Sequence, residues 1–376
     1  MIAALAAWLI PLAIISVMVA RRPLHRSATE TANQAAEDWW ARKDLYQGHL
    51  GMNYLPQFAI VFSPFWAVPG RAPGDILWRV FSTAVLLYGI WRLTRNVFGE
   101  GCGRAFFLVS AISLWPCLSS MRNGQANELL SALLVVSTAL ILEKRWWPAA
   151  CIIAFSIIIK PLGIVMLGLA VFVYRPLIVP CIIAVLAVAL SPFLFGPPDY
   201  VWNQYVFLVD NLKDCATVTE HRFADINGIF RTLGHGLPND VSLVLRPLAG
   251  LVVLGLWLFG ARRTEEPFRA LMFLALSSAY IVVFNPMTEA NSYVIVGPAM
   301  GIMAVYLGSR EKRVGLGWAV AVMVLTIGLL PEPLRRLTPN FSLWWHPTMA
   351  ILFAGVVFYR AFGVGGKPGN SVINEP

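Results

Sequence analysis

The stretch RNGQANELLSALLVVSTALIL, residues Arg122 to Leu142, joins a cluster of polar side chains to a long apolar run. The polar residues at its start are Arg122, Asn123, Gln125, Asn127 and Glu128. The run that follows, LLSALLVVSTALIL, carries no charge and is apolar enough to lie in a bilayer. The sequence therefore predicts a membrane helix that begins with amides, and this combination guides the interpretation of the remaining chain.

The same apolar character extends over the whole chain. Of 376 residues, 58% are hydrophobic and 13% are charged, whereas about a quarter of residues are charged in an average soluble domain. Apolar spans recur at residues 2–20, 76–91, 105–118, 129–142, 149–159, 162–173, 177–194, 245–259, 271–284, 293–307, 315–330 and 345–358. We therefore predict an all-α polytopic membrane protein with about twelve transmembrane helices. A single transmembrane domain is expected over residues 1–363, followed by a flexible cytoplasmic tail at 364–376.

The basic residues predict how the chain crosses the membrane. We place the amino terminus in the cytoplasm and treat the proline-broken segment YLPQFAIVFSPFWAVPG as not crossing. Nearly all short basic loops then lie on one side, as the positive-inside rule expects; RRPLHR and the pair Arg335 and Arg336 are exceptions. We expect a multi-pass protein of the plasma or inner membrane. Its extracytoplasmic side would carry a first loop at 21–53, a large loop at 196–243, and most of the unusual polar residues.

Composition also argues against several other classes of protein. The net charge of +9 does not indicate nucleic-acid binding, because no compact basic face with interleaved aromatics is visible. The five cysteines form no CxxC pair, so neither a disulfide framework nor a zinc site is predicted. No carboxylate cluster has the spacing of a hard-cation site, and we expect no metal and no cofactor. The first apolar segment lacks a basic n-region, which favours a retained helix over a cleaved signal peptide.

The first outer loop contains a stretch that can form an amphipathic helix. This stretch is ETANQAAEDWWARKDLY, residues Glu30 to Tyr46. Aromatic side chains with a polar tip prefer the membrane–water boundary. We therefore expect Trp39, Trp40 and Tyr46 at the level of the lipid head groups.

Lys160 is the most distinctive ionisable residue within the apolar spans. It interrupts SIIIKPLGIVML, and Pro161 removes a backbone donor at the same point. Charged residues at membrane depth are costly and invite a functional hypothesis. A cation at a helix break near the outer surface could hold a lipid-linked phosphate. The structural alternative is a lysine that extends from a helix end towards the interface.

The amides near Arg122 have two interpretations. Asn123, Gln125 and Asn127 could stabilise the start of the helix, with Asn123 or Gly124 as its cap and Glu128 in its first turn. Alternatively, they could bind the hydroxyls of a sugar, because an amide both donates and accepts hydrogen bonds.

Two further outer segments combine charges with polar side chains. The turn PMTEANSY carries Glu289, Asn291, Ser292 and Tyr293 at a helix start, where Asn291 or Ser292 could simply be a cap. The stretch TEHRFADING carries Glu220, His221, Arg222 and Asp225. These residues are candidates for ligand binding or ordinary solvated loop residues.

Taken in order, these segments resemble a known family. The resemblance rests on AAEDWWARKDLY followed by NYLPQFAIVFSPFWAVPG, on RNGQAN at a helix start, on the IKP break, and on WNQYVFLVDNLK with RFADINGIFRTLG. This pattern, over about Thr31 to Tyr293, is similar to the GT-C glycosyltransferases of the polyprenyl-phosphate-mannose-dependent alpha-mannosyltransferase type.

The resemblance implies an enzyme that takes a hexose, with mannose as the first candidate, from a polyprenyl-phosphate carrier. It implies transfer to a lipid or glycan acceptor on the extracytoplasmic side, with inversion at the anomeric carbon. An acid in the first outer loop would be the general base, and cations or amides would stabilise the departing phosphate. Lys160 fits the phosphate role, with Arg122 and Arg222 as further candidates. The wider donor site would include Asn123, Gln125, Asn127, His221, Glu289, Asn291 and Tyr293.

The first loop departs from the family pattern at the position of the expected base. Family members commonly have an Asp shortly before the paired alanines, whereas this chain reads SATETANQAA. The nearest acid there is Glu30, and Glu37 and Asp38 follow the alanines. The resemblance therefore implies a base among Glu30, Asp38 and Glu37.

A transporter or flippase that binds a glycolipid without cutting it is the main alternative. Such proteins show internal repeats with broken helices at corresponding positions. The break at Lys160 has no evident counterpart in the second half of the sequence. The polar residues also gather on one face rather than at the midplane, which favours the enzyme.

Overall fold

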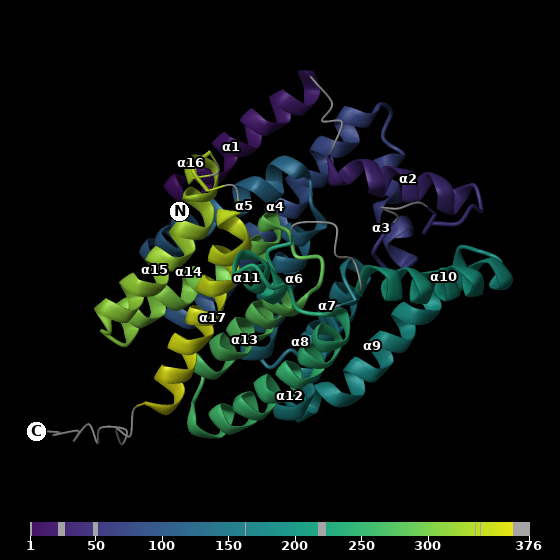
Figure 1. Cartoon of the computed structure of the whole chain (residues 1–376). Helices are drawn as coiled ribbons and strands as arrows, with labels where there is room; N and C mark the ends of the chain where they lie inside the picture. The colour runs from purple at the N-terminus through teal and green to yellow at the C-terminus, as the bar shows by residue number, and fades with distance from the viewer. Residues whose placement is uncertain are drawn as a thin grey trace, which may run out of the picture.

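The computed structural model describes residues 2–21, 27–47, 52–161, 163–216, 223–334, 336–338 and 340–363. Within these ranges the chain is helical and forms no strand (Figure 1), which confirms the predicted all-α membrane fold. The predicted tail at 364–376 lies outside the described residues.

Within the described residues, seven helical segments are long and apolar enough to cross a membrane. They are α1 (Ile2–Arg21), α4 (Arg71–Phe98), α5 (Gly103–Asn123), the segment Arg175–Leu194 around α9 (Ile178–Leu190), α12 (Asn239–Arg263), the segment Ala290–Arg310 around α14 (Gly297–Val305), and α17 (Phe341–Phe362). Shorter apolar helices are α3 (Gln57–Trp66), α6 (Ala126–Leu142), α7 (Trp146–Ile159), α8 (Gly163–Val173), α13 (Phe268–Phe284) and α15 (Val314–Leu329). The remaining helices are α2 (Ala28–Trp40), α10 (Pro198–Ala216), α11 (Ile226–Thr232) and α16 (Pro331–Leu334).

The centre of the bundle is formed by α6 and α13. Almost every residue of both helices is buried, as expected for helices that are apolar on all sides. The polar groups of α6 have partners on other helices. Oγ1 of Thr83 donates to Glu128 at 2.8 Å, and Oγ of Ser131 donates to the carbonyl of Val294 at 2.9 Å. These bonds fix α6 against α4 and against the turn before α14.

The basic connections gather at one end of the bundle. The guanidinium of Arg92 at the end of α4 pairs with Glu143 after α6 at 2.5 Å. Arg360 at the end of α17 pairs with Glu311 at 2.5 Å, and Arg310 donates to the carbonyl of Val97 at 3.1 Å. The sequence pattern of basic loops therefore corresponds to a real end of the molecule.

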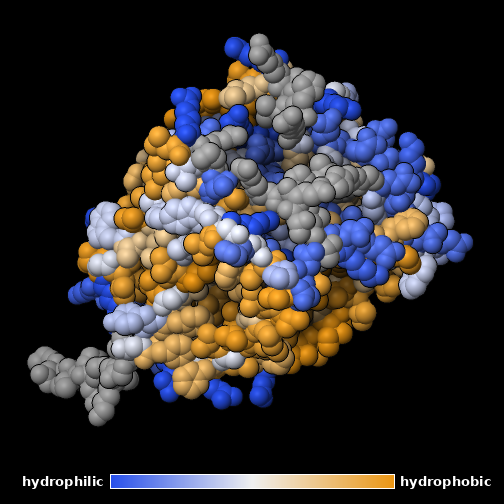
Figure 2. All heavy atoms as spheres, viewed as in Figure 1, coloured by the Kyte–Doolittle hydropathy of each residue, from blue (hydrophilic) through white to orange (hydrophobic). Residues whose placement is uncertain are grey.

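The opposite end contains the predicted first and large loops, which pack against one another. The backbone N–H of Leu45 donates to Gln204 at 3.0 Å. Nδ2 of Asn211 donates to Asn53 at 2.9 Å. In Figure 1, α2, α3 and α10 lie together on one side of this end. Figure 2 shows hydrophilic residues over α2 and α10, with apolar residues over α12 and α9.

The helix α2 confirms the predicted amphipathic helix, but the expected positions of two aromatic residues are wrong. Trp39 and Tyr46 are buried within the protein rather than placed among lipid head groups. The Trp39 ring lies 5.3 Å from that of Tyr200, and the Tyr46 hydroxyl donates to the Tyr54 carbonyl at 2.9 Å. The apolar face of α2 is covered by other segments of the chain, so it does not need lipid. Trp40, in contrast, is 44% exposed.

Candidate functional site

The amide-rich stretch forms a sharp break between two helices. α5 continues through Asn123, and Gly124 adopts a left-handed conformation with φ of 63°. α6 begins at Ala126 with Gln125 at its N-cap, where no side chain caps the helix. The predicted cap at Asn123 or Gly124 is therefore wrong, because glycine at a positive φ reverses the chain within a single residue. The prediction of Glu128 in the first turn is confirmed.

Buried donors hold this break in place. The guanidinium of Arg79 is almost completely buried and donates to the carbonyls of Met121 and Arg122 at 3.0 and 3.1 Å. Nε1 of Trp78 donates to the carbonyl of Gly124 at 3.1 Å. Oγ of Ser27, just before α2, donates to the Asn123 carbonyl at 2.9 Å. The last carbonyls of α5 thus have partners, and the first turn of α2 packs behind the break.

The amides join the second polar turn to form one cluster. Nε2 of Gln125 donates to Oε2 of Glu289 at 3.2 Å, and Nδ2 of Asn291 donates to the same oxygen at 2.9 Å. Nδ2 of Asn127 contacts Oε1 of Gln125 at 2.9 Å and Oγ of Ser292 at 3.0 Å. Asn291 and Ser292 are therefore used for side-chain bonds rather than as the helix caps that the structural alternative predicted.

Lys160 lies beside this cluster. It follows α7 in an extended conformation, and α8 begins at Gly163, which confirms the predicted helix break. Burial lowers the pKa of the Lys160 ammonium to about 8, and the nearby Glu289 carboxylate partly offsets this effect. The ammonium is thus mainly charged at neutral pH, and it lies close enough to the Glu289 carboxylate for the two charges to interact.

Tyr54 is a member of this region that the sequence did not single out. Burial and the charge of Glu289 raise its pKa to about 12, so its hydroxyl remains a donor at neutral pH. Residues from the segment that follows the first loop, from three helix breaks and from both halves of the chain therefore lie in one polar region.

A comparison with known families fits this arrangement. The family profile for glycosyltransferase family 87 matches residues 53–286, more than half of the chain. The chain belongs to glycosyltransferase family 87. No curated protein matches it. Membership confirms that this is a membrane glycosyltransferase and favours the enzyme over the transporter alternative. In this glycosyltransferase the matched region includes the amide break and Lys160, and ends just before Glu289.

The acids predicted as general bases, Glu30, Glu37 and Asp38, have their recorded contacts outside the polar cluster. Oε1 of Glu30 lies 3.6 Å from a nitrogen of Arg71. Glu30 and Glu37 line a separate pocket of about 220 Å³ together with Arg71. Asp38 accepts from Gln34 at 3.0 Å and lies 3.9 Å from Lys43. Ser27 and Thr29, at the start of α2, lie against the amide break, whereas the Glu30 carboxylate turns towards Arg71.

The remaining candidates differ in their accessibility. Tyr293 is completely buried, and its hydroxyl donates to the carbonyl of Ala224 at 2.7 Å; it supports the turn from behind. Asn123 is partly exposed. His221 and Arg222 lie outside the described residues. In the part of the chain that the structure describes, no group of three His, Cys, Asp or Glu side chains could hold a metal ion.

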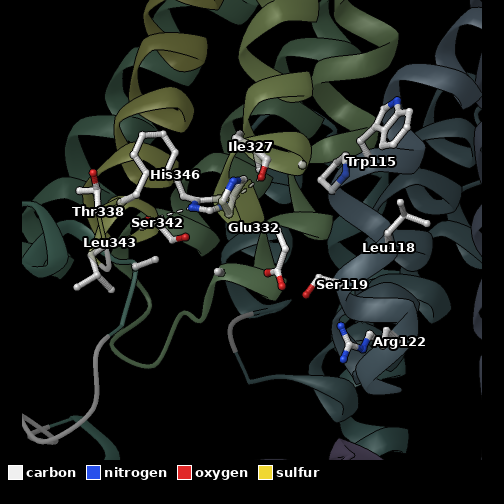
Figure 3. A pocket seen from close by; sticks show the side chains of 16 residues that line it. Trp115, Leu118, Ser119, Arg122, Ile327, Glu332, Thr338, Ser342, Leu343 and His346 are labelled. Atoms are coloured by element: carbon white, nitrogen blue, oxygen red, sulfur yellow. Dashed lines mark hydrogen bonds between the residues drawn. The ribbon is translucent and has the colours of Figure 1, made fainter. Parts of the chain in front are cut away.

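A second polar cavity adjoins the cluster. It has a volume of about 550 Å³ and lies between α5, α16 and the start of α17. Figure 3 shows Arg122, Ser119 and Glu332 around it, with His346 at its base. His346 is buried, and its ring nitrogens lie 2.9 Å from the Ser342 carbonyl and 3.1 Å from the Ile327 carbonyl. Glu332 lies in the polar outer segment PEPLRRLTPNFS, but its single isolated acid was not among the predicted site residues.

Proposed function

We propose that this glycosyltransferase moves a hexose, with mannose as the first candidate, from a polyprenyl-phosphate carrier to a lipid or glycan acceptor. The transfer would occur on the extracytoplasmic side of a plasma or inner membrane. The observation that carries the proposal is the hydrogen-bonded pair of Gln125 and Glu289 with the Lys160 ammonium in electrostatic range of the carboxylate. A cation, an acid and an amide from three chain breaks thus lie in one region.

The cluster suits the donor head group. The Lys160 ammonium would attract the phosphate and stabilise the charge that grows on it as the sugar leaves. Gln125 and Asn127 would contact the sugar hydroxyls, since amides can both donate and accept. Glu289 would accept from a sugar hydroxyl, and the protonated Tyr54 hydroxyl would donate to an oxygen of the donor.

The carrier chain would lie in an apolar groove between α12, α13 and α17. This groove has a volume of about 450 Å³ and is lined almost wholly by aliphatic and aromatic side chains from Leu245 to Phe358. Phe284, at the end of α13, lines it, and the chain reaches Glu289 five residues later. Such a groove would hold an isoprenoid chain while the phosphate reaches Lys160.

The general base is proposed among the first-loop acids, with Glu30 as the first candidate and Asp38 and Glu37 as alternatives. Glu30 and its partner Arg71 are 53% and 73% exposed, and exposed ion pairs are weak enough to separate when a substrate arrives. The released carboxylate would take the proton of the acceptor hydroxyl. That oxygen would form the new bond to the anomeric carbon as the bond to phosphate breaks, with inversion.

The sidedness rests on the distribution of basic residues. The end that carries Arg92, Arg310 and Arg360 would face the cytoplasm, as the positive-inside rule expects. The polar cluster lies at the other end of the same helices, because α5 runs from Gly103 at the basic end to Asn123 at the cluster. The cluster would therefore open to the extracytoplasmic leaflet.

Transfer from a labelled donor would test the proposal. The purified full chain is given radiolabelled polyprenyl-phosphate mannose and extracted membrane lipids, and products are separated by chromatography. Lys160→Ala should lower turnover by about 10²–10³-fold, as expected when a group that stabilises the developing charge is lost. Glu30→Gln should lower it by about 10²–10⁴-fold if Glu30 is the base, and Asp38→Asn and Glu37→Gln are measured beside it.

Matched controls are available on α10. Asp210 and Lys213 form an exposed ion pair with each other at 2.8 Å, and exposed ion pairs contribute little, so Asp210→Asn and Lys213→Ala should retain wild-type turnover. Activity at the wild-type level in all of the Lys160, Glu30, Asp38 and Glu37 variants would overturn the assigned site. Absence of any sugar transfer by the wild-type chain would overturn the proposed donor and acceptor classes.

A further inference from the structure

The cavity between α5, α16 and α17 has features that the donor cluster does not use. Its apolar walls include Trp115, Leu118 and Leu343, and its polar groups include Ser119 and Ser342. Binding pockets characteristically combine an apolar lining with a few converging polar groups. A cavity of about 550 Å³ is within the range of known ligand sites, roughly 300–1,000 Å³.

Two opposite charges project into this cavity without pairing. Arg122 comes from the last turn of α5 and Glu332 from α16, and both are exposed. Among the described residues, neither side chain has an ion pair or a hydrogen-bond partner, although both face the same space (Figure 3). A ligand that bears an anionic group and hydroxyl donors would satisfy both, since a guanidinium binds phosphate and a carboxylate accepts from hydroxyls.

The cavity and the donor cluster share the same two turns. Arg122 precedes Gln125 by three residues across the α5–α6 break. Ala290, which lines the cavity, directly follows Glu289 of the cluster. The cavity therefore borders both turns that form the donor cluster, which brings the hydroxyls of a molecule bound in it towards Gln125 and Glu289.

One wall of the cavity is open to the apolar surface. Trp115 lines the cavity and is 38% exposed. Phe107 and Leu108, two turns earlier on α5, are each 39% exposed and lie on the same side of the helix, because residues seven or eight apart share a helix face. This exposed strip leads along α5 to the mouth of the cavity, as expected for a ligand with hydrocarbon chains.

We propose that this cavity is the acceptor site and that the acceptor is a lipid whose head group carries a phosphate and free hydroxyls. The phosphate lies against Arg122, the hydroxyls lie against Glu332 and Ser119, and the chains leave past Trp115. The assignment rests on the proposed transfer reaction. It places Arg122 with the acceptor phosphate rather than with the donor phosphate.

Binding of defined lipids to the purified full chain tests this assignment. Four radiolabelled probes are compared. Phosphatidylglycerol has a phosphate and hydroxyls, and a glucosyl diacylglycerol has hydroxyls but no phosphate. Phosphatidylcholine has neither a hydroxyl nor a net charge, and glycerol phosphate lacks hydrocarbon chains. Phosphatidylglycerol should bind most tightly. Arg122→Gln should weaken the binding of phosphatidylglycerol about tenfold and leave the binding of the glucosyl lipid unchanged, because only phosphatidylglycerol has an anion for the guanidinium.

The second variant isolates the hydroxyl contacts. Glu332→Gln should weaken the binding of both hydroxylated lipids by about fivefold to tenfold and leave the binding of phosphatidylcholine unchanged. Arg122→Lys should restore part of the preference for the anionic lipid. Lys213→Ala and Asp210→Asn, on α10, serve as controls for general effects of charge removal.

The outcomes separate this inference from the proposed reaction. Polyprenyl phosphate binding is measured in parallel and should depend on Lys160 and not on Glu332. If the four probes bind equally, or if neither Arg122→Gln nor Glu332→Gln changes their ranking, the acceptor cavity is wrong while the donor site stands. Binding of glycerol phosphate as tight as that of phosphatidylglycerol would overturn the lipid acceptor. Loss of polyprenyl phosphate binding by the wild-type chain would overturn the reaction itself.

Discussion

Nε2 of Gln125 donates a hydrogen bond to Oε2 of Glu289 at 3.2 Å, although 164 positions separate the two residues in the sequence. Asn291 donates to the same oxygen at 2.9 Å. This carboxylate ties the break between α5 and α6 to the turn before α14. The polar cluster is thus defined by contacts between chain breaks, and its geometry depends on how the helices pack.

A double-mutant cycle should detect this contact. Gln125→Ala and Glu289→Ala should each reduce the free energy of unfolding by about 0.5–1 kcal/mol, because a charge-assisted hydrogen bond that is open to solvent contributes only modestly. The double variant should lose less than the sum, with a coupling energy of about 0.5–1 kcal/mol. Equilibrium unfolding in mixed detergent micelles provides the measurement. Strict additivity would show that the two side chains do not interact.

Substitution of Gly124 should damage the break between α5 and α6. Its φ is +63°, and a Cβ there would lie 2.8 Å from both Nη2 of Arg79 and Cγ2 of Thr29. The left-handed conformation alone costs an alanine about 1–2 kcal/mol, and the close contacts add to this. Gly124→Ala should therefore lower the melting temperature and also reduce transfer activity.

Gly255 provides the matched control for this substitution. It lies within α12, and a Cβ there would meet no atom within 4 Å. Gly255→Ala should be neutral or stabilising by up to about 1 kcal/mol, because alanine has a higher helix propensity than glycine. Equal losses in the two alanine variants would contradict the interpretation of the Gly124 turn.

Arg79 should be among the most sensitive residues of the fold. It is 1% exposed and donates to the carbonyls of Asp75, Met121 and Arg122 and to Oγ of Ser27. Arg79→Leu would leave these acceptors without their donor, so we expect a loss of about 3–5 kcal/mol or failure to accumulate. Arg79→Lys should rescue little, since one ammonium cannot reach acceptors arranged for a planar fork.

The control for Arg79 lies on the same helix. Arg95 is exposed, and its guanidinium stacks 5.7 Å from the ring centre of Trp91. Arg95→Leu should change the melting temperature by much less than Arg79→Leu does, measured by the loss of monodisperse protein on heating. If both variants were equally stable, the hydrogen bonds of Arg79 would not hold the α5–α6 break.

The apolar spans could be predicted from the sequence, but the helix ends could not. α4 was expected from residue 76 and begins at Arg71, and α5 was expected to end at 118 and continues to Asn123. Polar residues at these helix ends remain helical because neighbouring segments form hydrogen bonds with their backbone groups, as Arg79 does with the last carbonyls of α5. A hydropathy pattern detects the bilayer-like part of a helix and cannot detect a partner that is distant in the chain.

The candidate site shows the same limit. The polar turns and the break at Lys160 were visible because each interrupts an apolar run. The direction of the Glu30 carboxylate could not be predicted from the sequence, because its partner Arg71 comes from the start of a different helix. Trp39 was misplaced for a related reason: an alanine- and tryptophan-rich helix face looks the same whether lipid or another helix covers it, and here Tyr200 lies against it.

The pH dependence of donor use should follow Lys160. Burial lowers its pKa to about 8, so the ammonium that attracts the donor phosphate is lost as pH rises through this value, while the phosphodiester stays ionised. The kcat/KM for the donor, which reports the free enzyme, should therefore fall about tenfold per pH unit above roughly pH 8 and stay flat below it in the neutral range. Lys160→Arg should remove this alkaline decline even if its activity is lower, because a guanidinium remains charged throughout. An unchanged decline in the arginine variant would assign the titration to another group and remove Lys160 from the phosphate site.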